Sequence, residues 1–469
     1  MGQFITENRV FGVAALFTLT VVIGAVAANV LWLMVLPLAI IVGLLFVIDL
    51  KWAYLLLVVM LPFSIEFPVT ASLATDLPTE PLMILLMLCL VLYFIMHPQR
   101  FSRKFIKHPI IVFLLLHLVW IAISAVYSQI FIVSFKFLLA KTWYVASFVM
   151  ATSLFVKDYR SFKPVFWCLV IPLTFTVVYT LANHASMDFS FIDVNRSMKP
   201  FFRNHVNYAV MLAIVFPFLV QAKQWYKKGS IEQLVLGVGM LLFFLGIVFA
   251  YTRAAYISLF IMPFIYWAVK YRLIRWGAWF GLGVMALGMV YMLHNNNYLA
   301  YAPDFEKTIY HEDLDEHFAS TMEGEDLSTM ERVYRWVAAV RMSSEHPIMG
   351  FGPGNFYNFY KSYTVNAFQT YVSDNEEQSG VHNYFLMVLV DQGVIGLVLF
   401  LLFCVVTVIK GETIYHATKG SEDRALVMAA LVSIIVIMVN LLVSDMIEVD
   451  KIGTIFFMNI AILVNYGIK

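Results

Sequence analysis

The chain has 469 residues, of which 61% are apolar and 13% are charged, and its apolar runs repeatedly reach the roughly 17–25 residues that cross a bilayer as a helix. The formal net charge of +1 excludes the basic excess of a nucleic-acid-binding protein. Cys89, Cys168 and Cys404 all lie in apolar runs, so we expect packing residues and no disulfide framework. We predict an all-α integral membrane protein.

The apolar runs predict about 12–14 transmembrane helices in one polytopic bundle. The runs 10–27 and 31–48 come first, and Ala25-Val26-Ala27 resembles the cleavage site of a secretory signal. We favour two uncleaved spans paired as a hairpin, because the second run follows at once. A tilted or re-entrant element before residue 65 would bring the number toward twelve. The other spans are expected near 52–65, 81–96, 109–127, 137–156, 163–182, 205–222, 232–250, 254–269, 276–293, 383–409, 425–443 and 452–468.

Charge sets the expected orientation. With the N-terminus inside, most of the 31 Lys and Arg residues fall in cytoplasmic connections, and most of the 30 acidic residues fall on the other side. This is the distribution that the positive-inside rule describes. Both termini are therefore expected in the cytoplasm, and the long polar loop 294–381 outside it.

The first half of this outer loop is acidic and irregular. His311, Asp313, Asp315 and His317 cluster there, but they lack the spacing of a helix-borne metal site. We read them as part of a solvated loop and expect no metal.

The second half of the loop is expected to be helical from Ser328, which forms a capping-box pattern with Glu331. Arg332 and Arg335 lie together on one face of this helix. An apolar stripe on a different face could rest on the membrane or on the bundle. The stripe consists of Met330, Val333, Tyr334, Val337 and Val340.

Gly350-Phe351-Gly352-Pro353-Gly354 follows that helix. No strand precedes it, and it lies on the side of the membrane that lacks nucleotides, so it is not a nucleotide loop. We predict a sharp turn with close backbone approach.

Three residues that can carry positive charge share the outer membrane level. Arg203 precedes one span, Arg253 lies in a short turn between two spans, and His382 begins another. Such a set suits a lipid-linked phosphate or pyrophosphate, because Arg presents a planar fork of donors. The simpler interpretations are that each Arg snorkels to lipid headgroups and that the His caps or packs.

Two ionisable residues are expected inside spans, where charge needs a partner or a function. Lys141 enters the span at 137–156, near Lys136, and Asp391 lies about 13 Å into the span at 383–409. Lys141 could form a structural ion pair with Asp391, or it could contact the phosphates of a lipid-linked substrate. Both alternatives stay open.

Several motifs follow one another across residues 196–408. They are Arg203-Asn204-His205-Val206-Asn207, Thr252-Arg253-Ala254-Ala255-Tyr256, Glu331-Arg332-Val333-Tyr334-Arg335-Trp336, His346-Pro347 with the Gly/Pro turn, and His382-Asn383-Tyr384 followed by Asp391-Gln392-Gly393. In this order they resemble the bacterial O-antigen ligase and O-antigen polymerase superfamily. Asp391 departs from a common Glu, and Arg253-Ala254-Ala255 from a frequent Arg-Gly-Ala. We divide the chain into N-terminal spans (1–195), a ligase- or polymerase-like core (196–408) and C-terminal spans (409–469).

The resemblance implies a glycosyltransferase at the periplasmic face of the bacterial inner membrane. It would move a preassembled glycan from undecaprenyl pyrophosphate to a lipid-anchored acceptor such as the lipid A core, with inversion and without metal or other cofactor. Arg203 and Arg253 would hold the pyrophosphate, and His382 would act as acceptor base, with a pKa near the working pH, or as a further phosphate contact. The weaker candidates for substrate binding are Arg332, Arg335, Lys141, His205 and Asn383.

Other functions stay open. A polymerase would extend an O-antigen or exopolysaccharide on its own carrier lipid, and a protein acceptor is a third variant. A transporter or flippase often shows paired broken spans and symmetric repeats, and neither is visible in the sequence. A structural scaffold would leave the outward Arg and His residues without a role.

Overall fold

A computed structural model describes residues 49–70, 73–100, 102–301, 327–368, 373–375 and 379–469, together with the isolated positions Thr20, Gly43 and Phe46. The predicted spans at 10–27 and 31–48 and the acidic cluster around His311 lie outside this described part of the chain.

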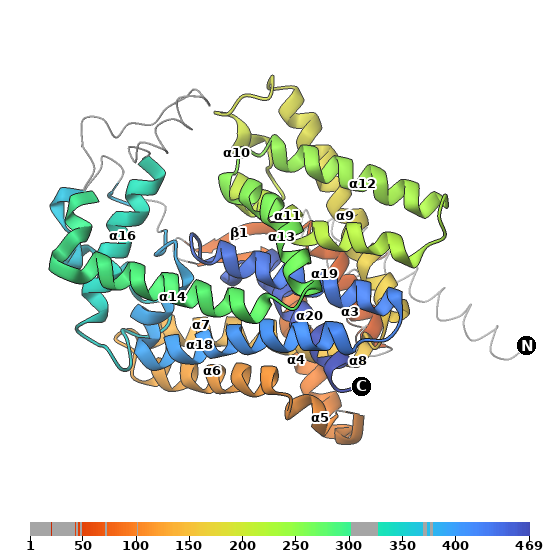
Figure 1. The fold of residues 1–469 in the computed structure, drawn as a ribbon, viewed down its shortest axis with the longest axis horizontal. Coiled ribbons are helices and arrows are strands. Elements are labelled where there is room, and N and C mark those ends of the chain that lie inside the picture. The colour runs from red at the N-terminus through yellow and green to blue at the C-terminus, as the bar shows by residue number, and fades with distance from the viewer. Residues whose placement is uncertain are drawn as a thin grey trace, which may run out of the picture.

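The described part is a bundle of helices with one short β-hairpin (Figure 1). Within the described residues, seven helical segments are long and apolar enough to cross a membrane, so the chain is a multi-pass, all-α membrane protein. These seven are α4 (Thr79–Met96), α6 (Pro109–Val126), the continuous α7–η3–α8 (Phe131–Phe155), α9 (Tyr159–Ala185), α11 with η4 (His205–Trp225), α12 (Ile231–Val248) and α18 (Tyr384–Ala417). The other long helices are α3 (Leu50–Met60), α13 (Arg253–Lys270), α14 (Ile274–Leu293), α16 (Leu327–Ser343), α19 (Ser421–Asn440) and α20 (Asp450–Gly467).

Each predicted span from 52–65 onward coincides with a helix, but several boundaries differ; α18, for example, runs to Ala417 rather than to residue 409. The span expected at 52–65 is the shorter helix α3, which ends at Met60 and is followed by the hairpin. The span expected at 137–156 begins earlier, at Phe131, and passes through the π-helical turn η3 (Val145–Met150).

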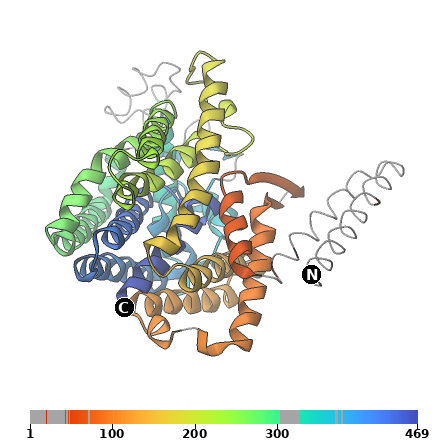
Figure 2. The same ribbon diagram turned by 90° about the vertical axis from the view of Figure 1, so that its right-hand side faces the viewer.

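The hairpin consists of β1 (Ile65–Thr70) and β2 (Leu73–Leu77), paired antiparallel so that Glu66 lies opposite Asp76. Figure 2 shows it at the end of α3 and α4, reaching outward from the bundle. Cross-strand partners point to the same side of a hairpin. The two acidic side chains therefore share one face.

The centre of the bundle is formed by α11, α19 and α20. Most residues of α11 and α19 and nearly all of α20 are buried, including Leu212, Leu431 and Ile460 at 0% exposure. A helix that is apolar on all sides belongs in the interior of a protein or bilayer. These helices fix the positions of the loops at their ends.

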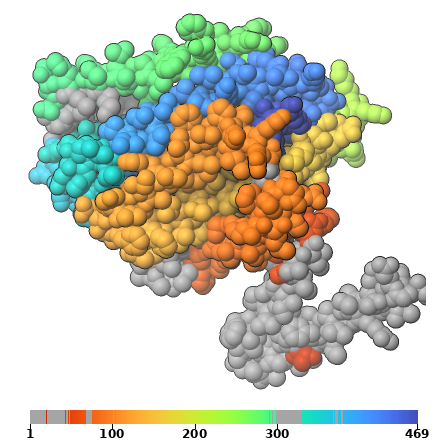
Figure 3. All heavy atoms as spheres, turned by 90° about the horizontal axis from the view of Figure 1, so that it is seen from below, coloured from red at the N-terminus to blue at the C-terminus, as the bar shows by residue number. Residues whose placement is uncertain are grey.

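The outer helices expose apolar side chains instead. Trp276, Phe280 and Leu287 on α14 are more than 70% exposed, as expected for side chains that face lipid. Figure 3 shows another face, where α6 and α7 run together and residues 327–368 lie at one end.

That end, which we call the α16 end, gathers the polar loops. There α16 packs against the first turns of α18, and α6, α14 and α18 run side by side away from it (Figure 1). The backbone N–H of Tyr384 donates to Leu441 O (2.9 Å), which ties the start of α18 to the end of α19. Lys451 at the start of α20 donates to Ser64 O (2.7 Å) beside the hairpin.

Candidate functional site

The Gly/Pro turn is docked into a break in α18. Gly393 has φ +69° and ψ −174°, a conformation that interrupts the helix and is essentially restricted to glycine. The break leaves the carbonyls of Val390 and Asp391 free to bond the turn. Phe351 N–H donates to Val390 O, and Gly352 N–H donates to Asp391 O, both at 2.9 Å. A Cβ on Gly350 would lie 2.4 Å from the Asp391 carbonyl carbon. The predicted sharp turn with close backbone approach is confirmed.

Asp391 belongs to this docking. Its Oδ2 accepts from Gly354 N–H (2.8 Å), so the carboxylate binds the turn. The Lys141–Asp391 pair left open by the sequence is therefore wrong. Two segments of the motif set, the Gly/Pro turn and the residues around Asp391, thus contact each other through hydrogen bonds that hold the turn against α18.

Lys141 is paired with a different carboxylate. Only 3% of the residue is exposed, and its Nζ lies 2.5 Å from Glu448 Oε1 and 3.3 Å from the Tyr384 hydroxyl. Tyr384 in turn donates to Glu448 Oε1 (2.7 Å). This buried cluster joins α7, α18 and the connection between α19 and α20. Lys136, by contrast, is exposed.

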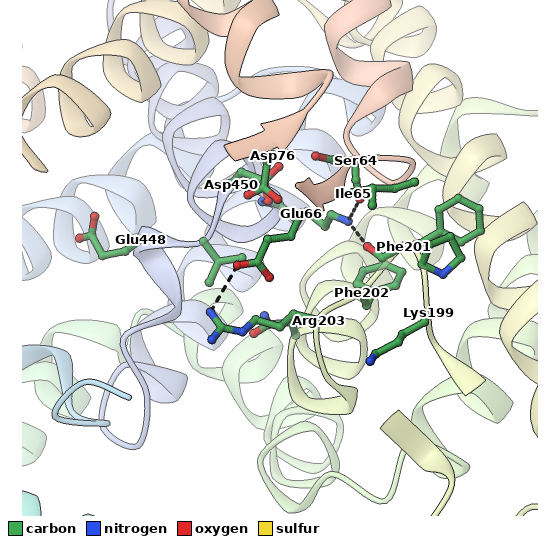
Figure 4. A pocket seen from close by; sticks show the side chains of 14 residues that line it. Ser64, Ile65, Glu66, Asp76, Lys199, Phe201, Phe202, Arg203, Glu448 and Asp450 are labelled. Atoms are coloured by element: carbon green, nitrogen blue, oxygen red, sulfur yellow. Dashed lines mark hydrogen bonds and ion pairs between the residues drawn. The ribbon is translucent and has the colours of Figure 1, made fainter. Parts of the chain in front are cut away.

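Arg203 reaches a cavity of about 590 Å³ at the α16 end. Its side chain is 61% exposed, and its Nη1 lies 3.8 Å from Glu66 Oε1 across the opening (Figure 4). The cavity is bounded by the hairpin, the segment before α11 and the segment before α20. Its lining consists of Ser64, Ile65, Glu66, Asp76, Lys199, Pro200, Phe201, Phe202, Arg203, Asn207, Glu448, Val449, Asp450 and Lys451.

Arg253 and His205 lie at the neighbouring turn. The side chain of Asn204 accepts from Asn207 N–H (2.9 Å) and caps α11, so Arg203 stands immediately before the helix. His205 Nδ1 hydrogen-bonds Ala250 O (2.8 Å) in the turn that leads to Arg253, the first residue of α13. His205 therefore holds the start of α13 against the start of α11, which places both arginines at the same end of the bundle.

His382 has a strained backbone conformation and lies near two arginines. Its φ of +56° is in the left-handed region, which non-glycine residues adopt rarely and often at functional sites. Burial and the nearby charges of Arg335 and Arg332 lower its pKa to about 3. The imidazole is neutral at ordinary pH, as expected, but the expected pKa near the working pH is wrong for the protein without substrate. A group with so low a pKa is a weak proton acceptor.

Arg335 is buried rather than offered to solvent. It is 7% exposed, and its Nη2 lies 3.2 Å from Glu331 Oε2 one turn earlier on α16. Glu331 also accepts from the Ser373 hydroxyl (2.5 Å). The predicted capping box is wrong, because the helix begins at Leu327 and Ser328 lies within it. The apolar stripe of α16 is packed inward, with Met330, Tyr334 and Val337 buried.

Asn383 has the role of a helix cap. Its side chain accepts from Leu386 N–H (3.1 Å), which satisfies one of the free donors at the start of α18. The sequence analysis had offered Asn383 only as a candidate for substrate binding.

Asp445 lies near Arg335 of α16 and near Arg203 before α11, and the sequence analysis did not identify it. It lies in the connection between α19 and α20, against Gly380, where an added Cβ would be 2.3 Å from its Oδ2. Burial and Glu448 raise the pKa of Asp445, while the charges of Arg335 and Arg203 lower it. Asp445 therefore lies close enough to both arginines for their charges to influence its pKa.

The candidate residues thus share one end of the bundle but not one cavity wall. Among the described residues, Arg203 lines the cavity, and Arg253 and His382 are not part of its lining. The sequence analysis also did not identify Glu66, Asp76 and the acidic residues before α20 as site residues. The available signal was the excess of acidic residues in connections assigned to the outer side.

Comparison with known proteins gives one result. Residues 238–401 match the family described as O-antigen ligase, a stretch that runs from α12 into α18 and contains Arg253, α16 and His382, while Arg203 precedes it. None of the curated proteins matches the chain. The family match confirms, over residues 238–401, the resemblance of this multi-pass membrane protein to the O-antigen ligase and polymerase superfamily that the motifs indicated.

Proposed function

We propose that this protein is a membrane glycosyltransferase that transfers a glycan from undecaprenyl pyrophosphate to an acceptor hydroxyl at the periplasmic face of the inner membrane. The observation that carries the proposal is the set of cationic side chains at the α16 end. Arg203 precedes α11, Arg253 begins α13, Arg332 and Arg335 lie on α16, and His382 precedes α18. The family match covers all of these except Arg203.

The arginines would stabilise the leaving group. Charge develops on the pyrophosphate as its bond to the anomeric carbon breaks, and fixed guanidinium donors in a poorly hydrated site stabilise that charge without reorganising. Arg335 suits this role because its ion pair with Glu331 fixes its position. Arg203 suits it because its exposed side chain already reaches a cavity.

His382 fits best as a hydrogen-bond donor to the phosphate. Its low pKa has two sources, burial and the arginine charges. A bound pyrophosphate would neutralise the second source and raise the pKa. Donor binding and protonation of His382 should therefore favour each other, so the donor should bind more tightly as the pH falls.

Within the class, we favour a ligase that transfers the glycan to the lipid A core by direct, inverting attack. The second candidate is a polymerase of O-antigen or exopolysaccharide. In a deletion strain, long carrier-linked chains with no glycan on the core indicate a ligase. Single repeats on the core indicate a polymerase.

The proposal is tested with the full chain reconstituted in liposomes, undecaprenyl pyrophosphate-linked glycan as donor and lipid A core as acceptor. Arg203→Ala and Arg253→Ala should each lower the transfer rate by about 10²–10³-fold, the effect of losing one donor to a developing charge. The matched control is Arg196→Ala, because Arg196 is exposed in α10 (Val194–Ser197), before the same helix, and does not line the cavity.

Wild-type rates in both arginine variants would refute the proposal. A transporter would instead move the intact donor across the bilayer without forming a glycosidic bond, with a rate that depends on a proton or sodium gradient.

A further inference from the structure

The cavity beside Arg203 is lined by four carboxylates, and three of them already have partners. Glu448 is bound to Lys141 and Tyr384. Asp450 accepts from the Thr79 hydroxyl (2.9 Å) and from Lys451 N–H (2.6 Å). Glu66 faces Arg203 at 3.8 Å.

Asp76 is the fourth, and it differs from the others. Within the described residues its carboxylate receives no hydrogen bond, although it lines the cavity. It lies opposite Glu66 in the hairpin, so both side chains point to the cavity face (Figure 4). An unbonded carboxylate at a cavity wall can accept a proton from a ligand.

The surroundings of Asp76 are mostly acidic. Asp450, Glu80 and Glu66 lie near enough to disfavour its charge, and Lys451 favours it. The hydroxyl of Tyr144 faces the same carboxylates from α7. Lys451 offers limited compensation, because its ammonium is engaged by Ser64 O (2.7 Å), Phe201 O and the Phe202 ring (4.5 Å). Burial and these acidic neighbours raise the pKa of Asp76 to about 7.

We propose that Asp76 is the proton acceptor for the attacking hydroxyl, and that this cavity binds the acceptor sugar. This proposal rests on the proposed glycosyl transfer. The acceptor oxygen forms a bond to the anomeric carbon of the donor while its proton passes to a carboxylate oxygen of Asp76. The bond from the anomeric carbon to the pyrophosphate oxygen breaks, and the electron pair leaves with the pyrophosphate beside Arg203. Water then takes the proton from Asp76.

Two features of the cavity support a sugar as its occupant. Carboxylate and asparagine side chains at its wall can bond hydroxyl groups, as Glu66 and Asn207 could, and the rings of Phe201 and Phe202 provide apolar surface. A volume of about 590 Å³ is within the range of small-molecule sites, roughly 300–1,000 Å³. This division leaves His382 for the donor phosphate and gives the proton to a group with a pKa near neutrality.

The main test is Asp76→Asn in the liposome transfer assay, with binding of undecaprenyl pyrophosphate measured separately. We expect transfer to fall by about 10²–10⁴-fold, the usual contribution of general base catalysis, while affinity for undecaprenyl pyrophosphate stays unchanged. Asp76→Glu should recover part of the rate. Arg203→Ala should instead weaken binding of undecaprenyl pyrophosphate.

The matched variant is Glu80→Gln. Glu80 lies outside the cavity lining and accepts a hydrogen bond from the Thr75 hydroxyl (2.6 Å), which a glutamine oxygen can also accept. Removing its charge should lower the pKa of Asp76. The acidic limb of the rate profile should therefore move to lower pH at an unchanged maximal rate. A purely structural Asp76 would leave this limb in place.

The outcomes separate the two proposals. If Arg203→Ala loses transfer but Asp76→Asn retains it, Asp76 is not the base and the glycosyltransferase proposal stands. If Asp76→Asn loses transfer together with thermal stability, and Glu80→Gln does not shift the pH profile, Asp76 is structural and the inference is wrong. If the wild-type protein forms no glycosidic bond, the proposed function itself fails.

Discussion

The buried pair between Lys141 and Glu448 gives a quantitative test of the packing at the α16 end. The Lys141 side chain is 4% exposed and that of Glu448 is 23% exposed, with 2.5 Å between Nζ and Oε1. Replacing Lys141 by Met removes the ammonium and leaves Glu448 facing Asp445. Losing one partner of a buried pair costs about 3–5 kcal/mol. We expect a loss of about 3 kcal/mol, because Glu448 is partly solvated and keeps the hydrogen bond from Tyr384.

Glu448→Gln should cost less than Lys141→Met. The ammonium that remains still contacts the Tyr384 hydroxyl and lies over the rings of Phe137, Tyr384 and Phe457 at 5.4–5.7 Å. Such contacts are worth roughly 0.5–2 kcal/mol. The double variant should recover most of the stability, because neither an unpaired cation nor an unpaired anion is left buried.

The assay is unfolding by sodium dodecyl sulfate in mixed micelles, which gives a free energy for each variant. The sum of the stability losses of the two single variants should exceed the loss of the double variant by at least about 2 kcal/mol, as for residues in direct contact. Lys136→Met on the same helix is the control. Lys136 is exposed, so its change should stay within about 0.5 kcal/mol. Additive losses in the double variant would show that the two charges do not stabilise each other.

Two further predictions concern the break in α18 and the acid sensitivity of the site. Gly393→Ala should destabilise the protein by at least about 2 kcal/mol in the same assay, because the glycine-only conformation is strained for other residues and the new Cβ would lie 2.0 Å from Ile348 O. Gly283→Ala, in open space on α14, should be neutral or stabilising; equal effects of the two would contradict the docking of the turn. The pKa of His382 is about 3 in the folded protein and 6.5 ordinarily. As the pH falls, the unfolded chain therefore binds this proton before the folded protein does. The free energy of unfolding falls as the pH drops from about 6.5 toward 3. His382→Gln should therefore lose less stability between pH 7 and pH 4.5, by up to about 1.4 kcal/mol per pH unit, and an identical loss would show that His382 is not buried beside Arg335.

Much of the architecture follows from sequence patterns alone. Runs of apolar residues long enough to cross a bilayer predicted the apolar helices α3, α4, α6, α7–α8, α9, α11–α14 and α18–α20, since a backbone in lipid must satisfy its hydrogen bonds internally. The glycines at 350, 352 and 354 predicted the turn, because few other residues adopt its conformation. The motifs around Arg253 and His382 predicted the family that the comparison found.

The partners of the charged residues were decided by tertiary structure. Lys141 could have met Asp391 by depth in the membrane, but the kink at Gly393 turns Asp391 toward the Gly/Pro turn and leaves Lys141 to Glu448. The low pKa of His382 and the raised pKa of Asp76 arise from burial and from charges on other elements. Periodicity tells which residues share a helix face, whereas contacts between residues hundreds of positions apart depend on how the helices pack. The sequence thus determined which groups reach the α16 end, and the packing decided which of them can carry charge, bind phosphate or accept a proton there.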